Sequence, residues 1–265
     1  MSIQKVSFDA IQKVRKYIKT ILALPDSENH PKTWISFNET DEPPEPESLA
    51  DLGGLFNIGT LPEETSHVPN TEGQWFLSSS NPGAAITKLP GVQLKSNLRL
   101  VSYLHRFKED GMGAIWALPE PLSTTANLEK ALANSGDYDY PPHPEGALEN
   151  FMEAIEGDRS APSFVIASIL LRELQEFGAL GRHCDWTHHR IIQETPPQVT
   201  WNWRGEVPAD LSPKVRIFSD GKAAVEFFTC RVVPPVAIFQ HIDQYPAGLY
   251  RPNCLDRIVA TVQRS

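Results

Sequence analysis

The segment Ser160–Gly178, with the sequence SAPSFVIASILLRELQEFG, decides the fold because it contains the start signal, the apolar length and the stop signal of one helix. Ser160 is a preferred N-cap residue, Pro162 suits the first helical turn, and glycine is favoured just after a last turn. Apolar residues lie on more than one face of this helix: Phe164, Ile169, Leu170, Leu171, Leu174 and Phe177. We therefore predict a deeply buried helix that the rest of the chain covers.

After Gly181 the apolar residues change from helical spacing to alternation, which is typical of strands. The alternating segments are 186–192, 199–203, 215–218, 223–232, 236–241 and 257–262. Two of them flank Asp220-Gly221, a strong hairpin signal, and we predict a two-residue turn there. Residues 183–265 are therefore expected to form a β-rich subdomain, an antiparallel sheet or small barrel, on which the buried helix packs.

The N-terminal part is expected to be helical and irregular. Apolar residues three and four positions apart predict an amphipathic helix over 7–24, which Pro25 ends. The stretch 39–51 is acidic and proline-rich, which is typical of an extended, solvated loop. The remaining pattern predicts strands at 34–37, 75–77 and 114–118, a strand or helix over 98–107, and helices over 124–133 and 143–156. We interpret residues 1–265 as a single compact α+β unit.

Charge and composition argue against several classes of function. The chain has 24 Lys+Arg and 33 Asp+Glu, a net charge of −9, which opposes binding to nucleic acid or to anionic membranes. The longest uncharged apolar run, Ser163–Leu171, is far shorter than the roughly 18 residues of a membrane span. Three widely spaced cysteines and the lack of a secretory leader favour a reducing, cytoplasmic location.

Common catalytic motifs are missing from the sequence. It has no Gly-x-Ser-x-Gly, no His-Glu-x-x-His and no Walker A loop, and Gly111-x-Gly113 lacks a third glycine because residue 116 is Trp. These absences disfavour hydrolase, NAD and ATP chemistry. The sequence therefore favours a soluble accessory or protein-interaction protein without catalytic residues, metal ligands or cofactors, whose partner is another protein or a small molecule.

One set of residues supports an enzyme as the alternative. His183 and Asp185 are two positions apart, His241 follows Asp185 by 56 residues, and Arg251 follows ten later. This spacing resembles the facial triad of Fe(II)/2-oxoglutarate-dependent oxygenases. The resemblance implies His183, Asp185 and His241 as iron ligands and Arg251 as the anchor of a co-substrate carboxylate, with Fe(II) and 2-oxoglutarate as cofactors. The protein-interaction hypothesis predicts instead that these three ligands do not converge.

A second alternative is small-molecule binding by an aromatic face of the C-terminal sheet, with Trp186, Trp201, Trp203 and Arg251 as binding residues. Trp201 and Trp203 are two positions apart and point the same way in a strand. If their face meets the buried helix it is core, whereas if it is exposed it suits a planar ligand or a peptide.

The cysteines allow two further sites. Zinc could bind Cys184, His188 or His189, Cys230 and Cys254, although only Cys184 and His188 are close in sequence. Cys184 with a neighbouring histidine could also act as a nucleophile pair, although a cysteine in a strand is more often a small apolar residue.

Overall fold

The computed structural model describes residues 2–29, 72–197 and 199–262. The expected strand at 34–37 and the acidic loop at 39–51 lie outside these ranges. Within them, no helix is both long enough and apolar enough to cross a membrane.

The C-terminal half and the N-terminal strand β1 (Ser2–Lys5) together form a seven-stranded antiparallel sheet. Six strands follow one another across it: β1, β9 (Lys214–Ile217), β10 (Ala223–Arg231), β11 (Ala237–Tyr245), β12 (Asn253–Val262) and β8 (Trp201–Trp203). The seventh, β7 (His189–Ile192), pairs with β10. One edge of β10 is therefore divided, because residues 223–226 pair with β9 and residues 228–231 pair with β7.

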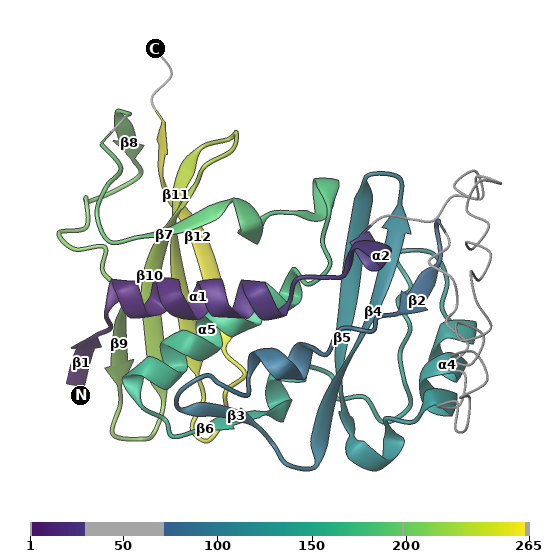
Figure 1. Cartoon of the computed structure of the whole chain (residues 1–265). Helices are drawn as coiled ribbons and strands as arrows, with labels where there is room; N and C mark the ends of the chain where they lie inside the picture. Colours follow the sequence, from purple (N-terminus) through teal and green to yellow (C-terminus); the bar gives the residue numbers. More distant parts are fainter. Residues whose placement is uncertain (1, 30–71, 198, 263–265) are drawn as a thin grey trace, which may run out of the picture.

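Two helices lie across this sheet, α5 (Ala161–Gln175) and α1 (Phe8–Ile21) (Figure 1). The side chain of Ser160 caps α5 by accepting a hydrogen bond from the Ser163 amide, and Gly178 has the positive φ that suits its place after the helix. Leu171 and Leu174 are 4% and 2% exposed. The predictions of a buried central helix on an antiparallel sheet and of an N-terminal amphipathic helix are therefore confirmed.

The part of the chain before α5 contains more strand than we expected. β2 (Trp75–Leu77), β4 (Leu98–Phe107) and β5 (Asp110–Pro119) form a second antiparallel sheet. β5 begins earlier than the predicted strand at 114–118, so Gly111 and Gly113 both lie inside it. A Cβ atom at Gly113 would lie 2.4 Å from the Phe177 carbonyl oxygen, so this glycine permits the close approach of β5 to the end of α5.

The predicted helix at 143–156 is also wrong. Gly146 has a φ of +77°, and the Leu148 amide donates to the Ala117 carbonyl of β5, so the segment bonds to a strand instead of to itself. It ends in a short 3₁₀ helix η4 (Phe151–Ala154) and in β6 (Ile155–Gly157), which pairs with β3 (Val92–Leu94). The remaining short elements are α2 (Asp26–Asn29), η2 (Pro82–Ala85), η3 (Glu120–Leu122) and the expected helix α4 (Thr125–Ala133).

The fully buried Arg106 of β4 joins the second sheet to α5 and α2. Its guanidinium donates to the carbonyl oxygens of Gly178 (2.7 Å) and Glu28 (2.8 Å). These two carbonyl groups, one in α2 and one just after α5, stabilise the buried cation because hydrogen bonds from a charged donor are strong. Burial lowers the pKa of Arg106 to about 10, which leaves the side chain charged at neutral pH.

The predicted hairpin between β9 and β10 is confirmed, but its turn is one residue longer than expected. The Phe218 amide donates to the Lys222 carbonyl, and the Gly221 amide donates to the Phe218 carbonyl. The loop is therefore Ser219–Gly221, with Gly221 in the left-handed region at a φ of +80°. The longer loop shifts the register by one residue and places Val215 opposite Val225.

We expect Gly221→Val to lower the free energy of unfolding by about 1–2 kcal/mol, because a side chain disfavours the left-handed backbone. A steric clash does not contribute to this loss of stability, because a Cβ atom at Gly221 would contact only the Ala247 Cβ, at 3.7 Å. Gly205→Val is the matched control, because a Cβ atom there has no neighbour within 4 Å and φ is not in the left-handed region. Urea unfolding of both variants tests the prediction, and equal stabilities would contradict it.

Candidate functional site

Polar side chains gather on the face of the sheet that meets α5. Alternation along β10 places Val225, Phe227 and Thr229 on this face, and the register with β11 puts Asp243, His241 and Phe239 directly beside them. Asp256 of β12 lies opposite His241, and β7 adds His189. A pocket of about 280 Å³ lies between these strands, α5 and residues 183–186. We name it the relay pocket, after the chain of hydrogen bonds described next. It is lined by Arg172, Gln175, Glu176, His183, Asp185, Trp186, His189, Phe239, His241 and Asp256.

Four of the side chains at this site form a continuous hydrogen-bonded relay. Asp256 Oδ1 lies 2.8 Å from His241 Nδ1, and His241 Nε2 lies 2.8 Å from Thr229 Oγ1. Thr229 Oγ1 in turn lies 2.7 Å from His189 Nδ1. His189, Thr229 and His241 are each at most 3% exposed, so the relay is shielded from solvent along most of its length.

The direction of the relay follows from what each group can donate. An ionised Asp256 only accepts, so His241 donates from Nδ1 and must accept at Nε2 from the Thr229 hydroxyl. The Thr229 oxygen then accepts from His189 Nδ1, which leaves a lone pair on His189 Nε2. This direction requires neutral histidines. Burial lowers the pKa of both rings, that of His189 to about 4, so both are neutral at physiological pH.

The lone pair on His189 Nε2 has no hydrogen-bond partner among the described residues, although the atom is buried. Its neighbour is Asp185 Oδ1 at 3.8 Å, beyond hydrogen-bond distance. The Asp185 side chain is 77% exposed and contacts Arg231 Nε at 3.3 Å. A largely exposed carboxylate therefore lies close to a buried, unpaired base.

Arg172 of α5 fixes the acidic end of the relay. Its guanidinium binds both oxygens of Asp243, at 2.7 and 2.9 Å, and reaches Asp256 Oδ1 at 2.9 Å. Burial alone would raise the pKa of Asp256. The hydrogen bond from His241 and the charge of Arg172 outweigh that effect and lower the pKa to about 2. Asp256 is therefore ionised at neutral pH and holds His241 in the tautomer that the relay needs.

Trp186 forms a rigid wall of the relay pocket instead of an exposed binding side chain. It is 7% exposed, and its indole Nε1 donates to Glu173 Oε1 at 2.7 Å. Arg15 of α1 pairs with the same carboxylate at 2.6 Å and lies 4.5 Å from the centre of the indole ring. Trp186 is therefore covered by α1 and α5 and is not part of an exposed aromatic face.

The proposed iron ligands lie around the relay pocket, but their donor atoms do not suit a facial triad. His183 and Asp185 do not share a strand face, because Gly181, at a φ of +56°, begins the 3₁₀ turn η5 (Gly181–His183) and Asp185 precedes a second, η6 (Trp186–His188). Both ring nitrogens of His241 are hydrogen-bonded within the relay. Arg251 forms an ion pair with Glu153 and does not line the pocket. Within the described ranges, no three His, Cys, Asp or Glu side chains are grouped to hold a metal ion.

The zinc set does not converge either. Cys254 lies opposite Asp243 and Cys230 lies opposite Ile238, and these two positions are about 17 Å apart along β11. Burial raises the pKa of Cys184, and its thiol donates to the Ala179 carbonyl, so the Cys184 sulfur is not an activated nucleophile.

Trp201 and Trp203 lie on the other side of the sheet from α5. They are partly buried and pack against a small cluster of Leu211, Phe228, Ile238 and Ala260. Phe228 and Phe227 point to opposite faces of β10, so this cluster is separate from the helix-facing core. The idea that the tryptophan pair meets the buried helix is therefore wrong.

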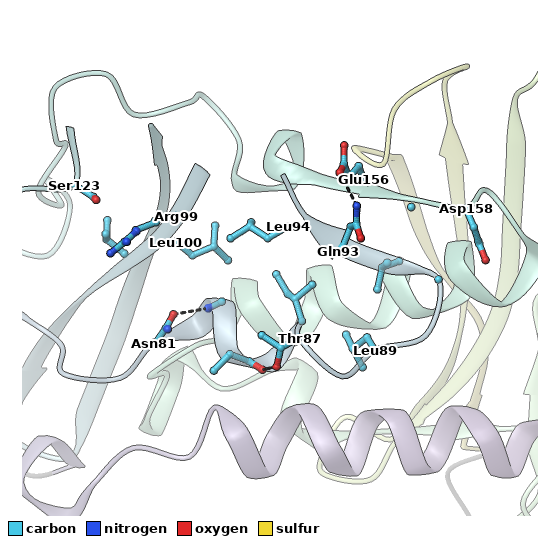
Figure 2. A pocket seen from close by; sticks show the side chains of 17 residues that line it. Asn81, Thr87, Leu89, Gln93, Leu94, Arg99, Leu100, Ser123, Glu156 and Asp158 are labelled. Carbon is cyan, nitrogen blue, oxygen red and sulfur yellow. Dashed lines mark hydrogen bonds between the residues drawn. The ribbon is translucent and has the colours of Figure 1, made fainter. Parts of the chain in front are cut away.

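A wider groove of about 1230 Å³ runs between η2, β3, β4 and β6 (Figure 2). Its polar side chains are already bonded to one another or to the backbone. Gln93 Nε2 donates to Glu156 at 2.7 Å, and Asn81 Oδ1 accepts from the Gly83 amide at 3.0 Å (Figure 2). The groove therefore offers no unpaired base comparable with His189.

Comparison with known proteins gives no relative from which to infer a function. No protein family, curated protein or solved structure matches this chain.

From the sequence, His189 was expected only as a zinc ligand, and no role was expected for Thr229, Asp256 or Arg172. Alternation in 189–192 could have placed His189 and Ile191 on one face. The pairing of β7 with β10, which brings His189 to Thr229, has no local signal in the sequence.

Proposed function

We propose that the protein binds a small molecule in the relay pocket and that His189 Nε2 accepts a proton from it. The observation that carries this proposal is the unpaired, buried Nε2 at the end of the relay. A buried nitrogen atom without a hydrogen-bond partner is rare in proteins. When such an atom lies beside a pocket lined by titratable groups, it is a candidate general base.

The relay gives the accepted proton a path away from the ligand. The ligand keeps the electron pair of the bond that breaks, and its proton moves to His189 Nε2. His189 then passes its Nδ1 proton to Thr229, and the Thr229 hydroxyl proton moves to His241 Nε2. The positive charge ends on His241, beside the ionised Asp256, at 2.8 Å. The charge is thereby stabilised by a carboxylate away from the reacting atoms.

The relay pocket restricts the size and shape of the ligand. Its volume of about 280 Å³ is near the lower end of the usual range of about 300–1,000 Å³ for small-molecule sites. Trp186 and Phe239 provide flat apolar walls. Such a pocket suits a small molecule, or one end of a longer one.

The proposed role of His189 as a general base can be tested without knowledge of the natural substrate. The test compound is 5-nitrobenzisoxazole. Removal of its carbon-bound proton breaks the N–O bond and releases a coloured phenolate. We expect the protein to accelerate this elimination by at least about 10²-fold over buffer, the lower end of general-base effects. His189→Asn should reduce the rate to the buffer value, because asparagine can still donate to Thr229 but lacks Nε2.

His188→Asn is the matched control, because His188 is the adjacent histidine and does not line the relay pocket. In the unsubstituted protein the rate should fall as the pH is lowered through about 4, where His189 becomes protonated. A rate no higher than that in buffer, or equal rates for His189→Asn and His188→Asn, would refute the proposal.

Interaction with another protein is a second proposal. It is supported by the partly exposed Trp201 and Trp203 on the short strand β8 and by the exposed Val199 and Val207 on either side of it in the sequence. Exposed apolar residues that gather in one region are typical of protein interfaces.

A further inference from the structure

A second pocket lies on the other side of His183 from the relay pocket. We name it the aromatic pocket; its volume is also about 280 Å³, and its walls include His105, Phe107, Met112, Tyr138 and His183. Phe107 and Tyr138 are 47% and 39% exposed, unusually high for large aromatic side chains. Two exposed aromatic rings at one pocket provide a surface that can bind a flat apolar group.

His183 is a wall of both pockets, so the two pockets are neighbours. The segment that carries His183 is fixed to the second sheet, because the Leu180 amide donates to the Gly111 carbonyl of β5 at 2.8 Å. The His183 ring is 5.9 Å from the Tyr138 ring, centre to centre. A molecule that fills both pockets would therefore pass over the imidazole of His183.

The charges around the relay pocket favour a cation, whereas those around the aromatic pocket balance. At the relay pocket, three carboxylates line the wall, those of Glu176, Asp185 and Asp256, against the one guanidinium of Arg172; Arg231, outside the lining, pairs with Asp185. At the aromatic pocket, Arg182 is paired with Asp110 at 3.2 Å, and the charge of Asp137 is balanced by Lys108, whose Nζ lies 5.2 Å from the centre of the Phe107 ring. A negative site attracts cations and repels anions such as dicarboxylates.

We infer that the ligand is an arylalkylamine, with its aromatic ring in the aromatic pocket and its ammonium group at the acidic wall of the relay pocket, beside Asp185. This inference rests on the proposed function only in assigning the relay pocket to the reacting end of the ligand. The ring contacts Phe107 and Tyr138, and the aliphatic chain crosses His183.

Three indoles with the same ring and different end groups test this assignment: tryptamine, tryptophol and indole-3-acetate. Their dissociation constants can be measured by calorimetry or from NMR shifts. We expect tryptamine to bind most tightly and indole-3-acetate most weakly, with at least about a fivefold difference between the amine and the alcohol, as for one ion pair near a surface. Equal affinities, or a preference for the acid, would overturn the inference.

Two substitutions test separately the contact with the aromatic ring of the ligand and the contact with its ammonium group. Tyr138→Ala should weaken the binding of tryptamine and of tryptophol by the same factor. Tyr140→Ala is its control, because Tyr140 is exposed and lies outside both pockets. Asp185→Asn should weaken tryptamine alone. An unchanged tryptamine affinity in Tyr138→Ala would also overturn the inference.

The binding experiment needs no proton transfer, so its result is independent of the elimination assay. If the three indoles bind in the predicted order but the protein does not accelerate the elimination, the role of His189 as a general base is refuted and the assignment of an arylalkylamine ligand is supported. Elimination without ranked indole binding would do the reverse.

Discussion

Asp243→Ala is expected to lower the free energy of unfolding by about 3–5 kcal/mol, because it leaves the Arg172 guanidinium buried without its main counterion. The Asp243 side chain is fully buried, the Arg172 side chain is 6% exposed, and two hydrogen bonds join them. The double substitution Arg172→Met with Asp243→Leu should be less destabilising than Asp243→Ala alone, because it removes both charges and fills the space.

Urea unfolding of these variants measures the effect, and Glu145→Ala provides the exposed comparison. Glu145 pairs with Lys130 at 3.3 Å, and both side chains are more than 65% exposed. The loss of such a pair should change stability by less than about 1 kcal/mol. If Asp243→Ala were as mild as Glu145→Ala, the buried pair would not stabilise the fold in the way its geometry indicates.

Leu174→Ala is expected to lower the free energy of unfolding by about 2–5 kcal/mol, because it opens a cavity where α5 meets the core. Leu174 is 2% exposed and belongs to the main hydrophobic cluster with residues of α1 and both sheets. The same substitution at Leu249, which is 47% exposed, is the control and should be nearly neutral. Chemical denaturation decides between them, and a cost below about 1 kcal/mol for Leu174→Ala would contradict the central place of α5.

The elements that the sequence predicted best are those with local signals at both ends. Ser160 and Gly178 bound α5, and Thr124 caps α4 through the Asn127 amide. Residues 98–107 fitted a helix and a strand equally well in the sequence. Pairing with β5 along their whole length makes them β4, and that pairing is not encoded locally.

The segment 143–156 shows why a helix pattern can fail. Leu148, Phe151, Met152 and Ile155 have helical spacing. The hydrogen bond from Leu148 to Ala117 and the pairing of β6 with β3 satisfy the backbone through tertiary partners instead. The apolar spacing is still used, because Met152 and Ile155 are buried in the core.

The candidate site was the least predictable part, because its residues come from five separate places in the chain. His183, Asp185 and His241, which the oxygenase resemblance grouped as iron ligands, line one pocket in the structure. Their roles depend on Thr229, Asp256 and Arg172, whose contacts follow from strand register and from the position of α5. The spacing of residues along the sequence does not determine how the strands pair.

The divided edge of β10 has a consequence for motion. β7 has four residues and pairs with β10 alone, whereas β10 and β11 pair along nine residues. A short segment held on one side opens locally at a lower free energy than the sheet that supports it. Opening of residues 189–192 would therefore expose the lone pair of His189, but it would also break the hydrogen bonds that Gln12 and Arg15 of α1 donate to the carbonyl oxygens of Ile191 and His189.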